Sequence, residues 1–369
     1  MYPALHRTGW FDHSMPPSGF AVVNYHGVLP AGYSSEDPFL DGHLVEPQVF
    51  REQVRFLKAH YDVIEPEEFR ESVEQGKPLP PRSVLLTCDD GLFNPLTEML
   101  PILQEEKVSC LFFVTATSCS EDPGMLWFEE LYHLMRSQSA ASEAASQFLA
   151  EAVPEKGAKS FSDWWWSAVR TASKFDAETR ADWMSEFRAR CGTLPEQFEK
   201  RYRLLNLREL KRLSESGMSI GAHTRTHPIL AVSNDQEVRR EIQESKIQIE
   251  RAIGKPVWAL AYPFGNAATM GERELRLARK AGYSCAFLNV EHWEGQETNP
   301  FALCRTHVTS GMTLPEFAAH LSGVHARLQR AMAPSISYFR KRNVDANREN
   351  AAHSQSTPVQ SVRVRSEQA

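Results

Sequence analysis

The stretch "SVLLTCDDG" at residues 83–91 joins an apolar run to two adjacent aspartates and a glycine. The run "SVLLTC" is short and mostly aliphatic, which predicts a buried strand. Neighbouring residues on a strand face opposite ways, but the chain turns where the strand ends, and Gly91 permits an unusual turn there. Asp89 and Asp90 can then approach the same place, where two acids need a positive partner or an added proton. A metal ion meets that need.

Short apolar runs of the same kind alternate with helical patterns along the chain. Besides 83–88, strands are expected at 20–25, 109–115, 218–222, 257–262, 283–288 and 303–308. Helices are expected at 50–61, 94–106, 207–216, 235–253, 271–281 and 313–328. This alternation predicts parallel β/α units with right-handed crossovers. About seven units predict an α/β fold, a distorted (β/α)7-type barrel with its chemistry at the C-terminal strand ends.

One segment interrupts this alternation. Residues 119–205 show no convincing strand and predict a helical insertion of three or four helices. The insertion is rich in tryptophan, at Trp127, Trp164, Trp165, Trp166 and Trp183. These rings either pack the insertion onto the barrel or stack on sugar rings beside the site. Residues 19–328 are therefore expected to form one barrel domain that contains this insertion.

The two ends of the chain and its composition limit the possible functions. Residues 1–18 predict a flexible arm, and 329–369, rich in Asn, Ser, Gln, Ala and Arg, predict a disordered tail. A net charge of −6 argues against a nucleic-acid partner. The absence of a long apolar run and of a signal-peptide pattern favours a cytoplasmic protein without a transmembrane segment. The oligomeric state is not indicated.

A second polar motif, "HTRTH", follows the strand expected at 218–222. On a helical turn, the spacing of His223 and His227 brings both imidazoles to one side. Two histidines and one carboxylate leave positions open on a metal, as in catalytic sites that activate water. The other carboxylate can then act as a base. Alone, each motif is also compatible with a solvated helix face or a helix cap, but both follow strands, which favours a metal site.

These motifs together resemble those of the polysaccharide deacetylases, the NodB-homology or carbohydrate esterase family 4 group. The matching stretches are "VVNYHGV" (22–28), "LLTCDDG" (85–91), "HTRTH" (223–227) and "AYPFG" (261–265). Cys88 stands where the family motif has an aromatic residue. The resemblance covers about residues 20–115 and 205–325, and it leaves out the tryptophan-rich insertion.

The resemblance implies roles for individual residues. Asp89 is the expected catalytic base. Asp90, His223 and His227 are the expected ligands of a divalent metal, with zinc the expected ion. The backbone N–H of Phe264 falls where the family stabilises the oxyanion.

Two departures from the family pattern leave alternatives open. Ala261 occupies the position of an arginine that orients the base in many members, and Arg305 is the candidate replacement unless it forms a surface ion pair. The general acid is either His26, which follows the first strand, or His307, which follows the last. Tyr25 either hydrogen-bonds the substrate or packs.

The sequence thus predicts a metal-dependent hydrolase that removes N-acetyl groups from amino sugars of a glycan or glycoconjugate precursor. Such an enzyme hydrolyses a linear amide, and its partner is a carbohydrate or glycoconjugate substrate. Two alternatives remain open. One is hydrolysis of an N-formyl, O-acetyl or cyclic-ureide group at the same site. The other is a sugar-binding protein without catalytic activity.

Overall fold

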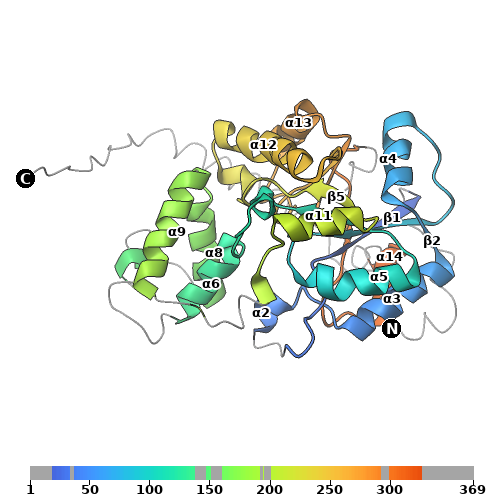
Figure 1. Ribbon diagram of the computed structural model, residues 1–369, viewed down its shortest axis with the longest axis horizontal. Coiled ribbons are helices and arrows are strands. Elements are labelled where there is room, and N and C mark those ends of the chain that lie inside the picture. The colour runs from blue at the N-terminus through green and yellow to red at the C-terminus, as the bar shows by residue number, and fades with distance from the viewer. Residues whose placement is uncertain are drawn as a thin grey trace, which may run out of the picture. The chain divides into compact units, whose positions relative to one another are not determined.

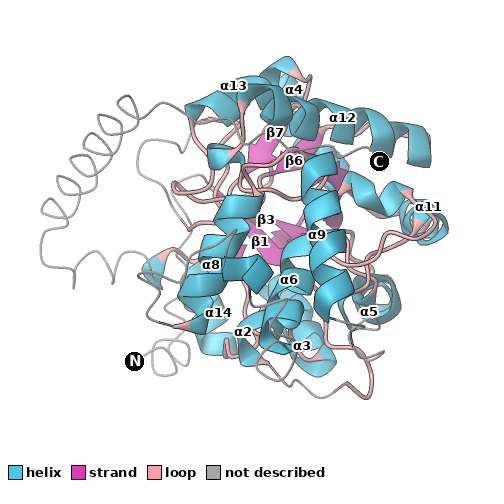
Figure 2. Ribbon diagram, turned by 90° about the vertical axis from the view of Figure 1, so that its left-hand side faces the viewer, coloured by secondary structure: helices cyan, strands magenta, loops and turns pink. Residues whose placement is uncertain are grey.

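Parallel strands form the centre of the protein, and helices surround them (Figure 2). The computed structural model describes residues 19–33, 37–137, 147–150, 160–191, 194, 201–291 and 299–325. The strands are β1 (Phe20–Tyr25), β2 (Asp62–Val63), β3 (Ser83–Cys88), β4 (Leu111–Val114), β5 (Ser219–Ala222), β6 (Ala259–Ala261), β7 (Cys285–Phe287) and β8 (Thr306–His307). Their order is β7-β6-β5-β4-β3-β1-β8, with β2 beside β3.

The segment that leads into β8 links the two edges of this sheet. Leu303 forms a parallel bridge with Phe287 of β7, and its N–H donates to the carbonyl of Ala286 at 3.0 Å. Further along the same segment, Thr306 pairs with Val23 of β1. The sheet therefore curls into a partial barrel, and the predicted α/β fold of the distorted (β/α)7 type is confirmed.

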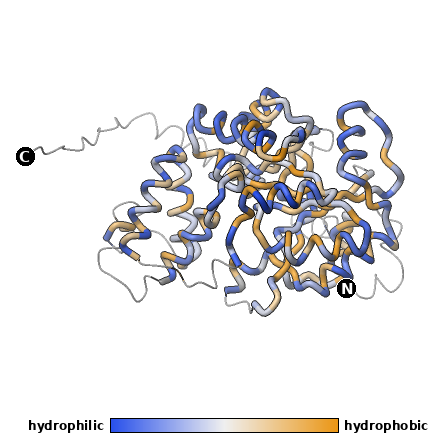
Figure 3. Tube along the Cα trace, viewed as in Figure 1, coloured by the Kyte–Doolittle hydropathy of each residue, from blue (hydrophilic) through white to orange (hydrophobic). Residues whose placement is uncertain are grey.

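Most helices lie where the sequence predicts them. Outside the insertion they are α2 (Pro38–Asp41), α3 (Pro47–His60), α4 (Pro66–Gln75), α5 (Leu100–Glu106), α11 (Leu207–Glu215), α12 (Asp235–Ile253), α13 (Glu272–Lys280) and α14 (Leu314–Leu321). The ends of α12 follow its sequence: the Asn234 side chain accepts from the Glu237 N–H, and Gly254 adopts the left-handed conformation after the last turn. Hydrophilic and hydrophobic residues alternate along these helices, as expected where one side is buried (Figure 3).

Four features differ from the sequence prediction. The sequence did not predict β2, α2 or α4; β2 has only two residues and shows no alternation. The helix expected at 94–106 begins instead with a π-helical turn, Pro95–Met99, in which the Leu100 N–H donates to the Pro95 carbonyl. Pro101 has no N–H, so the regular i→i−4 ladder cannot form there.

The barrel interior changes from apolar to polar along β1 and β3. Residues two apart face the same side of a strand. In β1 the buried Val22 is followed on that side by Asn24, and in β3 Leu85 is followed by Thr87 and then by Asp89. The apolar residues belong to the interior core cluster. Polar groups therefore gather at the carboxyl ends of the strands, where barrel chemistry is expected.

Three helices between β4 and β5 pack together on one side of the barrel (Figures 1 and 2). They are α6 (Trp127–Ser137), α8 (Phe161–Ala172) and α9 (Ala177–Cys191). The indole N–H groups of two tryptophans donate hydrogen bonds to backbone carbonyls: Trp127 Nε1 to His227 at 3.2 Å, and Trp165 Nε1 to Phe128 at 3.0 Å. The described residues up to Val324 form one compact unit. The predicted arm at 1–18 and the predicted tail at 329–369 lie outside the described residues.

Candidate active site

The turn after β3 presents its two aspartates differently. Asp90 and Gly91 both have left-handed backbone conformations, with φ of 76° and 71°. This conformation is uncommon for residues with a side chain, although aspartate tolerates it better than most. A Cβ at residue 91 would come within 3.1 Å of Val114, so glycine also fits the space. The turn thus brings Asp89 and Asp90, 2% and 7% exposed, to one cavity.

The two histidines after β5 lie on a loop, so the expectation of a helical turn is wrong. Thr224 and His227 have left-handed φ values of 63° and 62°, which fold the loop back on itself. The Thr224 hydroxyl accepts from the His227 N–H at 3.1 Å. From α12, the buried Glu241 accepts from the Thr226 N–H at 2.8 Å. These bonds, rather than helical periodicity, place His223 and His227 together.

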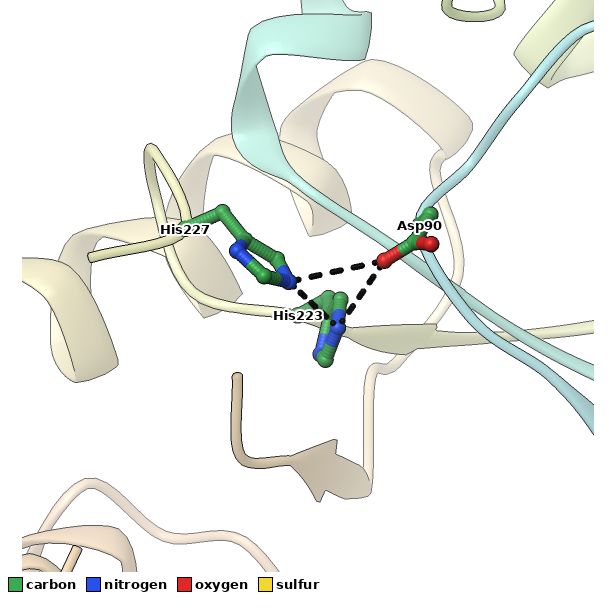
Figure 4. Close-up of side chains that lie close together, drawn as sticks. All are labelled: Asp90, His223 and His227. Atoms are coloured by element: carbon green, nitrogen blue, oxygen red, sulfur yellow. Dashed lines mark hydrogen bonds and ion pairs between the residues drawn. The ribbon is translucent and has the colours of Figure 1, made fainter. Parts of the chain in front are cut away.

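Asp90, His223 and His227 form a compact triangle of ligand atoms (Figure 4). The two Nε2 atoms are 3.1 Å apart, and Asp90 Oδ1 lies 3.4 Å from each. Ligand bonds of about 2.0–2.1 Å in a tetrahedral arrangement correspond to ligand separations of roughly 3.3–3.4 Å. Two imidazoles and a carboxylate are also ligands that zinc accepts. The three residues therefore fit a shared divalent cation.

The ring orientation of His223 is fixed by the backbone. Its Nδ1 lies 2.8 Å from the Ala261 carbonyl, and because a carbonyl only accepts, Nδ1 carries the proton. Nε2 is then the free ligand nitrogen, as in many metal sites with a hydrogen bond behind the histidine. The ring of His227 stacks on Phe128 with centroids 4.7 Å apart and meets the edge of Phe264 at 4.8 Å.

Asp89 is held by Arg305, the candidate replacement for the arginine that is missing at position 261. The guanidinium donates twice, from Nη1 to Oδ1 at 2.8 Å and from Nη2 to Oδ2 at 2.6 Å. Asn24 Nδ2 also donates to Oδ2 at 3.0 Å, and its Oδ1 accepts from Arg305 at 2.9 Å. Arg305 is 1% exposed, so the alternative of a surface ion pair is wrong.

These contacts keep Asp89 ionised. Burial alone raises its pKa, but the charges of Arg305 and His223 and the Arg305 hydrogen bonds outweigh burial, so the pKa is lowered from its ordinary 3.8. Both carboxylate oxygens are anchored, and the side chain still lines the cavity. Asp89 is therefore an oriented carboxylate beside the ligand triangle.

His26 and His307, the two candidates for the general acid, lie in one cluster with His43. The His26 ring is 4.7 Å from that of His307 and 5.3 Å from that of His43. His26 and His43 line the cavity, whereas His307 is absent from the described lining residues. Burial, then the neighbouring imidazoles His26 and His43, lower the pKa of His307 to about 2. His307 is therefore neutral at pH 7.

Phe264 and Tyr25 occupy very different positions. Phe264 lines the cavity with a left-handed φ of 59°, and its N–H donates no hydrogen bond within the described part of the chain. Tyr25 is fully buried and donates from its hydroxyl to Gln53 Oε1 at 3.0 Å, while its ring packs on Phe50. The substrate contact considered for Tyr25 is therefore wrong, because its strand position faces α3 rather than the barrel interior.

The cavity at this site has a volume of about 220 Å³ and is walled partly by the insertion. Its lining residues are His26, Phe39, Leu40, His43, Asp89, Asp90, Phe128, Glu129, Trp165, Trp166, His223, His227, Phe264, Asn266 and Asn289. Sequence reasoning did not single out Phe128, Glu129, His43 or Asn289. The pattern "WFEEL" reads as an ordinary amphipathic helix, and only the packing of α6 shows which residues face the site.

Comparison with known proteins agrees with this geometry. The family model described as polysaccharide deacetylase matches residues 193–286, which include His223, His227 and Phe264. The poly-beta-1,6-N-acetyl-D-glucosamine N-deacetylase of Escherichia coli (strain K12) is 35% identical over 96 residues, 25% of this chain but only 13% of that protein. The chain thus matches a small part of this curated relative.

Two solved structures share the fold over most of the described barrel. The Streptococcus pyogenes deacetylase PplD in complex with acetate has a TM-score of 0.52 and 16% identity, covering 82% of this chain and 97% of that one. IcaB from Ammonifex degensii has a TM-score of 0.52 and 17% identity with the same coverage. The chain is thus similar to polysaccharide deacetylases, in sequence over residues 193–286 and in fold over most of its length. The resemblance of this chain to that family is confirmed.

Within the described ranges, every helix is too short or too polar to cross a bilayer.

Proposed function

We propose that the protein is a metal-dependent hydrolase that removes N-acetyl groups from amino sugars of a glycan or glycoconjugate. The observation that carries this proposal is the Asp90, His223 and His227 triangle beside a carboxylate held by Arg305. The similarity to a poly-N-acetylglucosamine deacetylase supports an N-acetylated sugar as the substrate class. The aromatic lining of the cavity supports a sugar as well.

The three ligand residues would hold a divalent cation, with zinc the expected ion. When bound, the cation would polarise the acetyl carbonyl and make water more acidic. Asp89 would accept the proton of the attacking water, because it is ionised and anchored by Arg305 and Asn24. Arg305 and Asn24 act as positioning residues, since they orient Asp89 without facing the cavity.

The oxyanion and the leaving amine need donors of their own. The Phe264 N–H is available to stabilise negative charge on the former carbonyl oxygen. His26 is the proposed acid that protonates the leaving amine, because it lines the cavity and His307 does not. The His26 Nδ1 is buried and has no hydrogen-bond partner in the ranges that the structure describes.

The test is acetate release from a panel of N-acetylated amino sugars, including short β-1,6-linked N-acetylglucosamine oligomers. We expect release that a chelator abolishes and added zinc restores. Parallel assays with N-formyl, O-acetyl and cyclic-ureide substrates address the alternative reactions. Bound sugar without any released acetate in metal-loaded protein would instead support a binding protein. The pairing of Arg305 with Asp89 removes the main reason for that alternative.

A further inference from the structure

The insertion contributes one buried acid to the cavity that the proposed reaction does not use. Glu129 lies in the first turn of α6, is 6% exposed and lines the cavity together with Asp89 and Asp90. Its Oε2 is buried and lacks a hydrogen-bond partner among residues that the structure describes. A buried carboxyl oxygen without a partner costs stability, so its retention points to a partner that arrives with a ligand.

Arg201 affects the pKa of Glu129 at a distance, but it forms no ion pair or hydrogen bond with Glu129 among the described residues. Its Nε donates to Asp41 Oδ1 at 2.8 Å, Tyr202 donates to the same oxygen at 3.0 Å, and the buried Nη1 of Arg201 has no partner there. The next residue on α6 behaves in the ordinary way: Glu130 accepts two bonds from Arg188, at 2.6 and 2.8 Å. The two adjacent glutamates thus differ in what they face, because neighbours on a helix point about 100° apart.

The position of Glu129 relates it to an aromatic wall. Phe128, Trp165 and Trp166 line the same cavity, and the Trp165 and Trp166 rings are 4.6 Å apart. Apolar ring faces and one polar group are a combination that suits a sugar, which has an apolar face and a rim of hydroxyls. Glu129 supplies the polar group on the insertion side of the cavity, and it forms no ion pair with any residue that the structure describes.

We propose that Glu129 is a substrate-binding residue whose carboxyl donates a hydrogen bond to a hydroxyl of the sugar held in the cavity. This inference rests on the proposed function and adds a selectivity contact from the insertion. The contact is with a neutral hydroxyl, not with an amine.

The electrostatics of the site support a neutral, donating carboxyl. Burial raises the pKa of Glu129 to about 8; Arg201 lowers it, and Asp90 and Asp41 raise it further. The raised pKa favours the protonated carboxyl, which carries an O–H donor. The pKa of Glu129 is about 8 in the folded state and 4.5 ordinarily. The folded state therefore loses stability as the pH rises from about 4.5 to about 8. Glu129→Gln removes this loss.

The experiment compares Glu129→Ala, Glu129→Gln and the control Glu130→Gln in metal-loaded protein. The probe is a short β-1,6-linked N-acetylglucosamine oligomer, with KM, kcat and direct binding measured. We expect Glu129→Ala to raise KM and Kd roughly 5- to 50-fold, with little change in kcat or metal content. Glu129→Gln should restore most of the affinity, because an amide N–H can donate. Glu130→Gln should lower thermal stability and leave KM unchanged.

Deoxygenated analogues of the probe identify the contacted hydroxyl. The analogue that lacks it should bind wild type as weakly as it binds Glu129→Ala, so the two losses do not add. An infrared band of a protonated carboxylic acid should also be present in wild type and absent from Glu129→Gln.

Four outcomes would overturn the inference. Unchanged KM and Kd in Glu129→Ala, with only reduced stability, would assign Glu129 a structural role. If Glu129→Gln bound the probe as weakly as Glu129→Ala does, the contact would be one made by a charged carboxylate and not the proposed contact with a hydroxyl. If wild type neither binds nor deacetylates any sugar of the panel, the proposed function fails and this inference fails with it. If wild type deacetylates a sugar of the panel and the Glu129 variants have the same KM and Kd as wild type, this inference fails and the proposed function stands.

Discussion

The barrel loops and the insertion helices face the same cavity but differ in how they hold their acidic groups. On the barrel side the proposed base is paired, since Asp89 bonds Arg305, and the ring of His223 is fixed by the Ala261 carbonyl, although His26 Nδ1 and His227 Nδ1 have no partner among the described residues. On the insertion side the Glu129 oxygen has no partner within the described ranges, and the rest of the wall is aromatic. Groups with fixed partners are preorganised for one reaction, whereas an open polar group awaits a ligand.

The two regions are nevertheless joined at the histidine loop. Trp127 of α6 donates to the His227 carbonyl. Arg180 of α9 places its Nη2 3.6 Å from Oε1 of Glu241, and Glu241 of α12 accepts a hydrogen bond from the loop at the Thr226 N–H. Arg180 also donates to the Thr226 hydroxyl. The insertion therefore supports the histidine loop as well as the cavity wall. The variants below test whether the barrel residues act in the reaction and the insertion residues act in sugar binding.

The largest effects are expected on the barrel side, at Asp89 and His223. Asp89→Asn should retain metal and lose turnover by about 1,000-fold, because the amide cannot accept the proton from water. His223→Ala should lose metal, since one ligand of three disappears. Acetate release and elemental analysis of the purified variants measure the two properties separately.

A matched control separates these roles from damage to the fold. Glu130 is not among the described residues that line the cavity, so Glu130→Gln should keep both metal and turnover. If Asp89→Asn remained fully active, Asp89 would not be the base. If His223→Ala bound metal as tightly as wild type, the ligand triangle would be incorrect.

A smaller effect on turnover, with a larger effect on stability, is expected for Arg305→Met. Both partners of the ion pair are buried, at 0% and 2% side-chain exposure, and removing one leaves an uncompensated carboxylate. Such losses cost about 3–5 kcal/mol. Turnover should fall by about 100-fold because Asp89 loses its orientation. Urea unfolding and kcat measure the two effects, and unchanged stability in Arg305→Met would contradict the buried pair.

The sequence could indicate that several residues of the barrel side lie together because strand ends carry them. Asp89, Asp90 and His223 each follow a predicted strand, and parallel strands end at one edge, whereas Arg305 lies within the strand predicted at 303–308. The pairing of Arg305 with Asp89 could not be predicted, because it depends on the segment before β8 closing the gap between β7 and β1. The choice between two histidines was open for the same reason, since β1 and β8 are neighbours.

The local backbone and the insertion were harder to predict. The spacing of the histidine motif is compatible with a helix, and nothing in "HTRTH" indicates left-handed Thr224 and His227. In "WFEEL" the sequence cannot distinguish Glu129 from Glu130, because both are ordinary in a first helical turn. Which one faces the cavity is decided by how α6 packs on the barrel.

The smallest effect is expected on the insertion side, for Trp166→Ala. This ring lines the cavity and meets the edge of Phe264 at 5.3 Å, but it is only partly buried. Losing one aromatic face should raise the KM for an N-acetylglucosamine oligomer about 5-fold and leave kcat and metal content unchanged. Trp164→Ala, from the same helix but outside the described cavity lining, should leave KM unchanged. A fall in kcat without a change in KM for Trp166→Ala would mean that the insertion takes part in the chemistry, and the contrast between the two regions would not hold.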